Sequence, residues 1–192
     1  MVVKNYVKVL SLLLVLVFAF GICACDDITD SWRDDPKDKK SSAAELKYPL
    51  EGESGCYYGT RTETLYWYQN KEETEECKCF IFEYNGCYYL WETSSPEHAA
   101  REYQSIGPEK YFAKLFDEER YKVFNGSYDA SSKTSTYMIK SKITDTQYLL
   151  KTYTLEFDGN GGLSGSCKTM QVYESRDEAE PYETTTFTLK KK

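Results

Sequence analysis

Cysteine is the residue of this chain with the widest range of chemistry, because a thiol can carry lipid, bind a metal, attack a substrate or form a disulfide. Cys77 and Cys79 stand two residues apart, but thiolate metal sites need four ligands at short spacings, and the only histidine is His98. His98 lies at the start of a predicted helix next to Ser95 and Glu97, and nothing in the sequence places Cys79 or Cys87 within hydrogen-bond reach of it. We therefore expect no metal site, no cofactor and no catalytic site, so the protein is not expected to be an enzyme.

Cys25 follows the features of an export signal. Lys4 and Lys8 give a basic start, and residues 9–20 form an apolar run without a charged residue. Ile22-Cys23-Ala24-Cys25 then resembles the processing site of bacterial lipoproteins, which implies cleavage before Cys25 and fatty acyl groups such as palmitate on its thiol. Cys23 is the alternative lipid carrier, but the bulky Ile22 would precede it where that site requires a small residue.

An uncleaved membrane anchor is the other interpretation of this segment. The apolar stretch from Val9 to Ala24 has 16 residues, whereas a spanning helix takes roughly 17–25. We expect residues 1–24 to be a signal peptide and residues 25–51 to be the lipidated cysteine and a charged, flexible tether. The protein is then expected in a bacterial cell envelope, lipid-anchored to a membrane on its periplasmic or surface face. The sequence does not decide whether this is the inner or the outer membrane.

The composition excludes one class of partner. The chain has 31 acidic against 24 basic residues, a formal net charge of −7. Binding to a phosphate backbone requires a basic face, so we expect no nucleic-acid partner. Residues 52–192 have the length of one domain with one core.

Eighteen tyrosines cluster with threonine, valine and phenylalanine in short alternating runs, a pattern typical of β-strands. Ser95-Pro96 predicts a helix start between the third and fourth runs, and Gly107-Pro108 predicts a break before a second helical stretch. We therefore expect an all-β fold, an antiparallel up-and-down barrel of about eight strands with a short helical insertion after the third strand. The predicted strands are 56–68, 76–84, 87–91, 121–130, 136–143, 147–157, 163–173 and 182–189, with an acidic loop at 69–75.

Asn85-Gly86 is the clearest turn, because a type I′ hairpin turn needs positive φ at both central residues. The two-residue turn predicts that Tyr84 faces Cys87, Phe82 faces Tyr89 and Phe80 faces Trp91. We expect this aromatic face to point into the barrel, because the opposite face carries Glu83 and Glu92 and charges are rarely buried unpaired.

Three short motifs resemble the lipocalin-like lipoproteins of bacterial envelopes. They are Gly55-Cys-Tyr-Tyr-Gly59 at the start, Phe124-Asn-Gly-Ser-Tyr128 in the middle and Thr186-Phe-Thr-Leu-Lys190 at the end. The resemblance implies a calycin-type barrel over residues 52–192 whose mouth or interior holds a small apolar molecule.

Export would place the domain where disulfides persist. With Cys25 lipidated, the domain has an odd number of cysteines, so at least one is left without an intramolecular partner. In the expected barrel Cys56, Cys87 and Cys167 fall near one end, which makes Cys56–Cys87 or Cys56–Cys167 the candidate disulfides. A bond between Cys77 and Cys79 is not expected, because the rise along a strand puts their Cα atoms at the limit of what a disulfide spans.

Two hypotheses of function remain open. The first is a non-enzymatic, membrane-anchored binding module for a small hydrophobic ligand, with Phe82, Tyr89 and Trp91 lining the site. The second is a packed barrel that acts as an adhesin or envelope scaffold and contacts protein partners through its loops. Whether the barrel is hollow decides between them.

Overall fold

The computed structural model describes residues 46–117, 119–174 and 178–192. The predicted signal peptide, the lipid site at Cys25 and most of the predicted tether lie outside these residues. In the described part no helix is long and apolar enough to cross a membrane. The last tether residues contact the domain, since the backbone N–H groups of Lys47 and Tyr48 both donate to the carbonyl of Gln104 at 3.1 Å.

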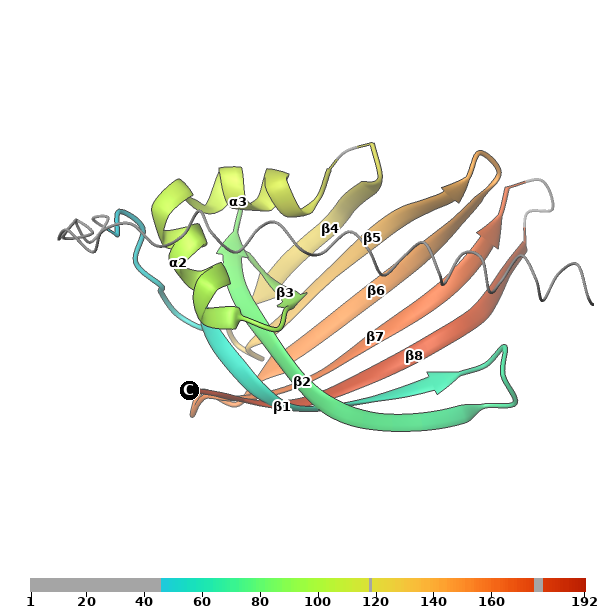
Figure 1. Ribbon diagram of the computed structural model, residues 1–192, viewed down its shortest axis with the longest axis horizontal. Helices are drawn as coiled ribbons and strands as arrows, with labels where there is room; N and C mark the ends of the chain where they lie inside the picture. Colours follow the sequence, from blue (N-terminus) through green and yellow to red (C-terminus); the bar gives the residue numbers. More distant parts are fainter. Residues whose placement is uncertain (1–45, 118, 175–177) are drawn as a thin grey trace, which may run out of the picture. The chain divides into compact units, whose positions relative to one another are not determined.

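The protein folds into one eight-stranded antiparallel sheet that curls into a nearly closed barrel, as predicted (Figure 1). The sheet order is β3-β2-β1-β8-β7-β6-β5-β4, so β3 and β4 are the two edges. The strands are β1 (Gly55–Leu65), β2 (Lys71–Tyr84), β3 (Cys87–Glu92), β4 (Tyr121–Asp129), β5 (Thr134–Thr144), β6 (Gln147–Phe157), β7 (Gly162–Tyr173) and β8 (Glu178–Lys191).

The helical insertion after the third strand consists of two helices, α2 (Pro96–Ile106) and α3 (Pro108–Leu115). A proline begins each of them, where its missing N–H costs no hydrogen bond. Gly107 separates the two helices with a φ of 89°, a conformation that disfavours other residues. Ser95 precedes α2 as predicted, but its side chain makes no capping hydrogen bond.

The prediction of an acidic loop at 69–75 was wrong. Strand β2 already begins at Lys71, and the first half of β2 pairs with β1. The pairing explains why a polar, acidic segment is a strand. Thr62 and Thr74 join their hydroxyls across the two strands at 2.8 Å, and Glu75 accepts a hydrogen bond from Arg61 Nε at 2.7 Å. Cross-strand pairs of these two kinds stabilise a sheet without apolar side chains.

The register of the β2–β3 hairpin is the predicted one, with Tyr84 opposite Cys87 and Phe80 opposite Trp91. Asn85 and Gly86 have φ values of 50° and 71°, as a type I′ turn requires. The predicted direction of the two faces, however, was wrong. Phe80 and Phe82 point out of the barrel, where their rings contact Tyr103 of α2 and Tyr111 of α3.

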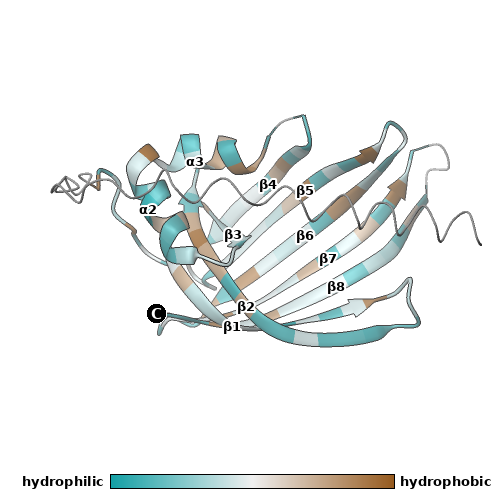
Figure 2. Ribbon diagram, viewed as in Figure 1, coloured by the Kyte–Doolittle hydropathy of each residue, from teal (hydrophilic) through white to brown (hydrophobic). Residues whose placement is uncertain are grey.

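The opposite face of the hairpin is the inner one. Tyr57 of β1 and Tyr88 of β3 both contact the ring of Phe157, across the barrel on β6, at 6.4 and 5.4 Å. Helices α2 and α3 therefore form a second apolar layer over the outside of β1, β2 and β3 (Figure 1). Figure 2 shows the consequence along β2, which is hydrophobic beneath the helices and hydrophilic toward its first residue.

The seam of the barrel is closed by side chains that join the edge strand β3 to β5, rather than by a ladder of backbone hydrogen bonds. The Ser135 hydroxyl of β5 accepts from Tyr88 N–H at 2.9 Å and donates to the Tyr88 carbonyl at 3.0 Å. Leu90 N–H donates to the Tyr137 hydroxyl at 3.0 Å. These bonds satisfy polar groups of β3 that an exposed edge strand would offer to another chain.

Candidate functional site

A cavity of about 260 Å³ lies inside the barrel where β3 ends. Its walls come from the last residues of β3, on both faces of that strand, and from the inner faces of β5 and β6, and the end of α3 and the start of β4 complete them. Most of the lining is apolar, with a few polar groups among it, as in sites for small molecules. The lining residues are Leu90, Trp91, Glu92, Leu115, Phe116, Tyr121, Ile139, Ser141, Leu149, Lys151 and Tyr153.

The rest of the interior on the side of α2 is packed. Tyr57, Ile81 and Leu155 are fully buried, and Phe157, Leu163 and Leu189 are at most 4% exposed. We call this part the closed half and the part that holds the cavity the open half. Gly59 lies in the closed half, where a Cβ atom would come 2.1 Å from the Thr188 carbonyl oxygen, so β1 and β8 approach more closely than any other residue would allow.

A network around Arg61 lies on the inner wall of the open half. Arg61 Nη1 lies 2.9 Å from Glu63 and 2.9 Å from Glu92, and the guanidinium also bonds Glu75. The network thus holds one arginine against three carboxylates, which leaves it with an excess of negative charge. Sequence analysis missed it, because Glu75 and Glu92 stand 14 and 31 residues from Arg61 in the chain and only the strand register brings them together.

Glu92 connects this network to the cavity. Burial raises the pKa of the Glu92 carboxyl, and Arg61 and Lys151 act against that rise. Tyr153 faces the same cavity, and burial raises the pKa of its phenol well above the ordinary value, so the hydroxyl stays protonated. The cavity thus combines apolar walls with a carboxylate, an ammonium and neutral hydroxyls. This set suits a small amphipathic molecule better than a purely apolar one.

The three residues predicted to line a ligand site are separated by the structure. Trp91 lines the cavity. Phe82 is fully buried beneath the helices, and Tyr89 packs on Phe112 of α3 at 5.1 Å and on Tyr137 at 4.7 Å. Phe82 and Tyr89 hold α2 and α3 against the barrel, and neither lines the cavity.

The five described cysteines are all unpaired, so neither of the predicted disulfides is present. Cys56 lies on the outer face of β1, Cys167 lies on the inner face of β7, and the Cys87 thiol is 3.2 Å from the Ser135 hydroxyl at the seam. The alternation of side chains along a strand therefore directs these thiols to different places. Cys77 and Cys79 face inward together, and a hydrogen bond between them lowers the pKa of Cys77 and raises that of Cys79.

A groove of about 830 Å³ runs between α3 and β4, next to the cavity. Phe116 and Tyr121 line both spaces, so these two rings form the wall between them. They contact edge to face at 6.5 Å, and Tyr121 is 37% exposed.

Among the residues that the structure describes, no group of three or more histidine, cysteine or acidic side chains is arranged to hold a metal ion. No known family model, curated protein or solved structure matches the chain. The physical features of the barrel are therefore the basis for any assignment of function.

Proposed function

We propose that this protein is a non-enzymatic binding module that holds a small amphipathic molecule in the cavity of its open half. The observation that carries the proposal is the cavity of about 260 Å³, lined mostly by apolar side chains with Glu92, Lys151 and Ser141 among them. Ligand sites for drug-sized molecules usually measure roughly 300–1,000 Å³, so the ligand is a small one. In this proposal Trp91, Leu149 and Phe116 contact its apolar body, and Glu92 and Lys151 contact its polar end.

The location belongs to the same proposal. The sequence of residues 1–25 favours export and lipid attachment at Cys25, and the resemblance to lipocalin-like envelope lipoproteins fits a barrel with an internal ligand. A barrel anchored in this way would hold or deliver its ligand at the membrane surface. Labelling with a fatty acid is expected to mark the wild-type protein and not Cys25→Ser, and label on the variant would contradict the anchor.

Native mass spectrometry after incubation with an envelope lipid extract tests the ligand. The wild-type protein is expected to carry an adduct of small mass that denaturation releases. Leu149→Trp should abolish the adduct, because the larger side chain fills the cavity from β6. Leu150→Trp is the matched control, since the next residue of the strand points to the opposite face and should leave uptake unchanged.

Two results would contradict the proposal: a wild-type protein that takes up nothing from the extract, or equal uptake by the two tryptophan variants. Circular dichroism and thermal unfolding of both variants show whether a loss of uptake comes from a filled cavity or from a damaged fold.

A further inference from the structure

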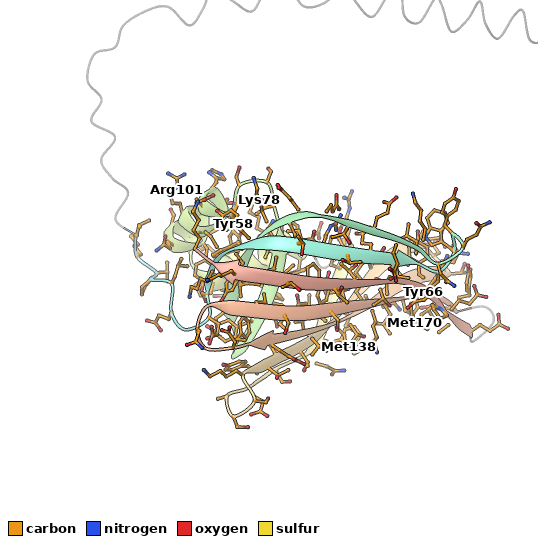
Figure 3. All side chains as sticks on the ribbon, turned by 90° about the horizontal axis from the view of Figure 1, so that it is seen from below. Tyr58, Tyr66, Lys78, Arg101, Met138 and Met170 are labelled. Atoms are coloured by element: carbon orange, nitrogen blue, oxygen red, sulfur yellow. The ribbon has the colours of Figure 1, made fainter. Side chains whose placement is uncertain are left out.

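Three consecutive aromatic residues are exposed at the turn between β1 and β2. Tyr66, Trp67 and Tyr68 are 43%, 60% and 54% exposed. Together with Tyr182 of β8 we call them the aromatic tip. Figure 3 shows Tyr66 at the opposite end of the strands from Tyr58 and Arg101, so the tip lies away from the helices. Large aromatic side chains grouped on a surface are typical of interaction sites.

The backbone and the ring contacts hold the aromatic tip in a defined geometry. Trp67 stacks on Tyr182 with centroids 6.1 Å apart and ring planes 21° apart. Tyr66 N–H donates to the Tyr182 carbonyl at 3.2 Å, and the hydroxyls of Tyr66 and Thr184 are 3.1 Å apart. The rings are therefore presented in one arrangement, which lowers the entropy cost of binding.

Carboxylates stand near the aromatic tip on both strands that meet there. On β2, Glu72 and Glu73 are the second and third residues, and on β8 Glu178 and Glu180 precede Tyr182 and Glu183 follows it. Lys71, the first residue of β2, already pairs with Glu73. In the described part of the chain no lysine or arginine forms an ion pair with Glu72, Glu178 or Glu180, and all three are exposed. Among residues 46–117, 119–174 and 178–192, the carboxylates of Glu72, Glu178 and Glu180 therefore offer negative charge that no ion pair offsets.

The aromatic tip already receives one cation from the protein itself, since Lys71 Nζ lies 5.9 Å from the centre of the Tyr68 ring. Exposed indole and phenol faces attract ammonium and guanidinium groups, and carboxylates nearby strengthen that attraction.

We propose that the aromatic tip is a docking site for a positively charged, arginine- or lysine-rich segment of a protein partner. Guanidinium or ammonium groups of the segment stack on Trp67 and Tyr68, and others pair with Glu72, Glu178 and Glu180. An anionic membrane surface would be repelled by the same carboxylates. The proposal is independent of the cavity, because none of these residues lines it.

The test is a titration of the full-length protein, in a non-ionic detergent, with a short synthetic peptide of alternating arginine and glycine, followed by Trp fluorescence and calorimetry. Binding is expected to be saturable and to weaken as the salt concentration rises. Trp67→Ala should weaken it about tenfold, and Trp67→Phe should restore part of the affinity because it keeps a ring.

A charge-matched pair of double variants separates the tip from the general acidity of the chain. Glu72→Gln with Glu180→Gln removes two charges at the tip, and Glu51→Gln with Glu109→Gln removes two exposed charges near the helices. Only the first pair is expected to weaken binding. Equal effects of the two pairs, unchanged affinity of Trp67→Ala, or preferential binding of a neutral oligosaccharide or of anionic lipid vesicles would each overturn the proposal.

Discussion

The two halves of this barrel are built from the same strands but filled in different ways. On β6, Leu155 and Phe157 lie in the closed half and are almost fully buried. Leu149 and Lys151, on the same face of the same strand, line the cavity of the open half. The difference arises where β3 ends at Glu92. The first residues of β2, before Cys79, pair with β1 on one side and have no strand on the other. A short edge strand is thus what leaves room inside an otherwise packed barrel.

The two halves also differ in the kind of interaction that lines them. Rings and aliphatic side chains meet in the closed half, whereas the inner wall of the open half carries the ion pairs of Arg61. Exposed ion pairs contribute little to stability, about 0–1 kcal/mol each, whereas a buried leucine contributes several times more. The closed half therefore contributes most of the stability of the fold, and the open half, where we propose that the ligand binds, contributes less.

The largest expected contrast comes from one substitution made in each half. Leu155→Ala should lower the free energy of unfolding by about 2–5 kcal/mol, because it leaves a void among buried side chains. Leu149→Ala, on the same strand, should cost less than about 1 kcal/mol, since its side chain is only half-buried and already borders a cavity. Urea denaturation measures both, and equal losses would show that the halves are packed alike.

The next effect concerns the seam that closes the barrel. Tyr137→Phe removes the acceptor of the Leu90 N–H in a buried place and should cost about 1–3 kcal/mol. Tyr148→Phe is the control, because this tyrosine is on the outer face of β6 and its hydroxyl makes no hydrogen bond in the described part of the protein. If both variants unfold at the wild-type urea concentration, side chains do not hold the seam.

The smallest expected effect concerns the pH dependence of folding stability, to which Glu92 and Glu97 contribute with opposite signs. Burial raises the pKa of Glu92, so the folded state binds its proton first, and the contribution of Glu92 to stability increases as the pH falls through that raised pKa. A hydrogen bond from Tyr58 lowers the pKa of Glu97 at the start of α2, so its contribution is lost as the pH falls through the lowered pKa.

Relative to Glu92→Gln, the wild-type protein should therefore gain stability on acidification, and relative to Glu97→Gln it should lose stability. Thermal unfolding of the three proteins over a series of pH values measures both differences. Two differences of the same sign would contradict the environments assigned to Glu92 and Glu97.

Local signals in the sequence determined most of the fold. Asn85-Gly86 set the hairpin register, since asparagine followed by glycine readily accepts positive φ at two adjacent positions, and Pro96 and Gly107-Pro108 marked the helices. The alternating runs placed eight strands, and an even number of antiparallel strands indicated a barrel. All these signals act within a few residues of each other, and they can therefore be recognised without knowledge of the tertiary contacts.

Only the tertiary structure decided which face of the hairpin points inward. Alternation along β2 assigns Phe80 and Phe82 to one face and Cys79 and Ile81 to the other, but it cannot say which face is inside. Charges at Glu83 and Glu92 suggested the wrong answer, because α2 and α3 bury the aromatic face from outside and Arg61 offsets the carboxylate within. The cavity and the Arg61 network depend on contacts between distant strands, which no local pattern contains.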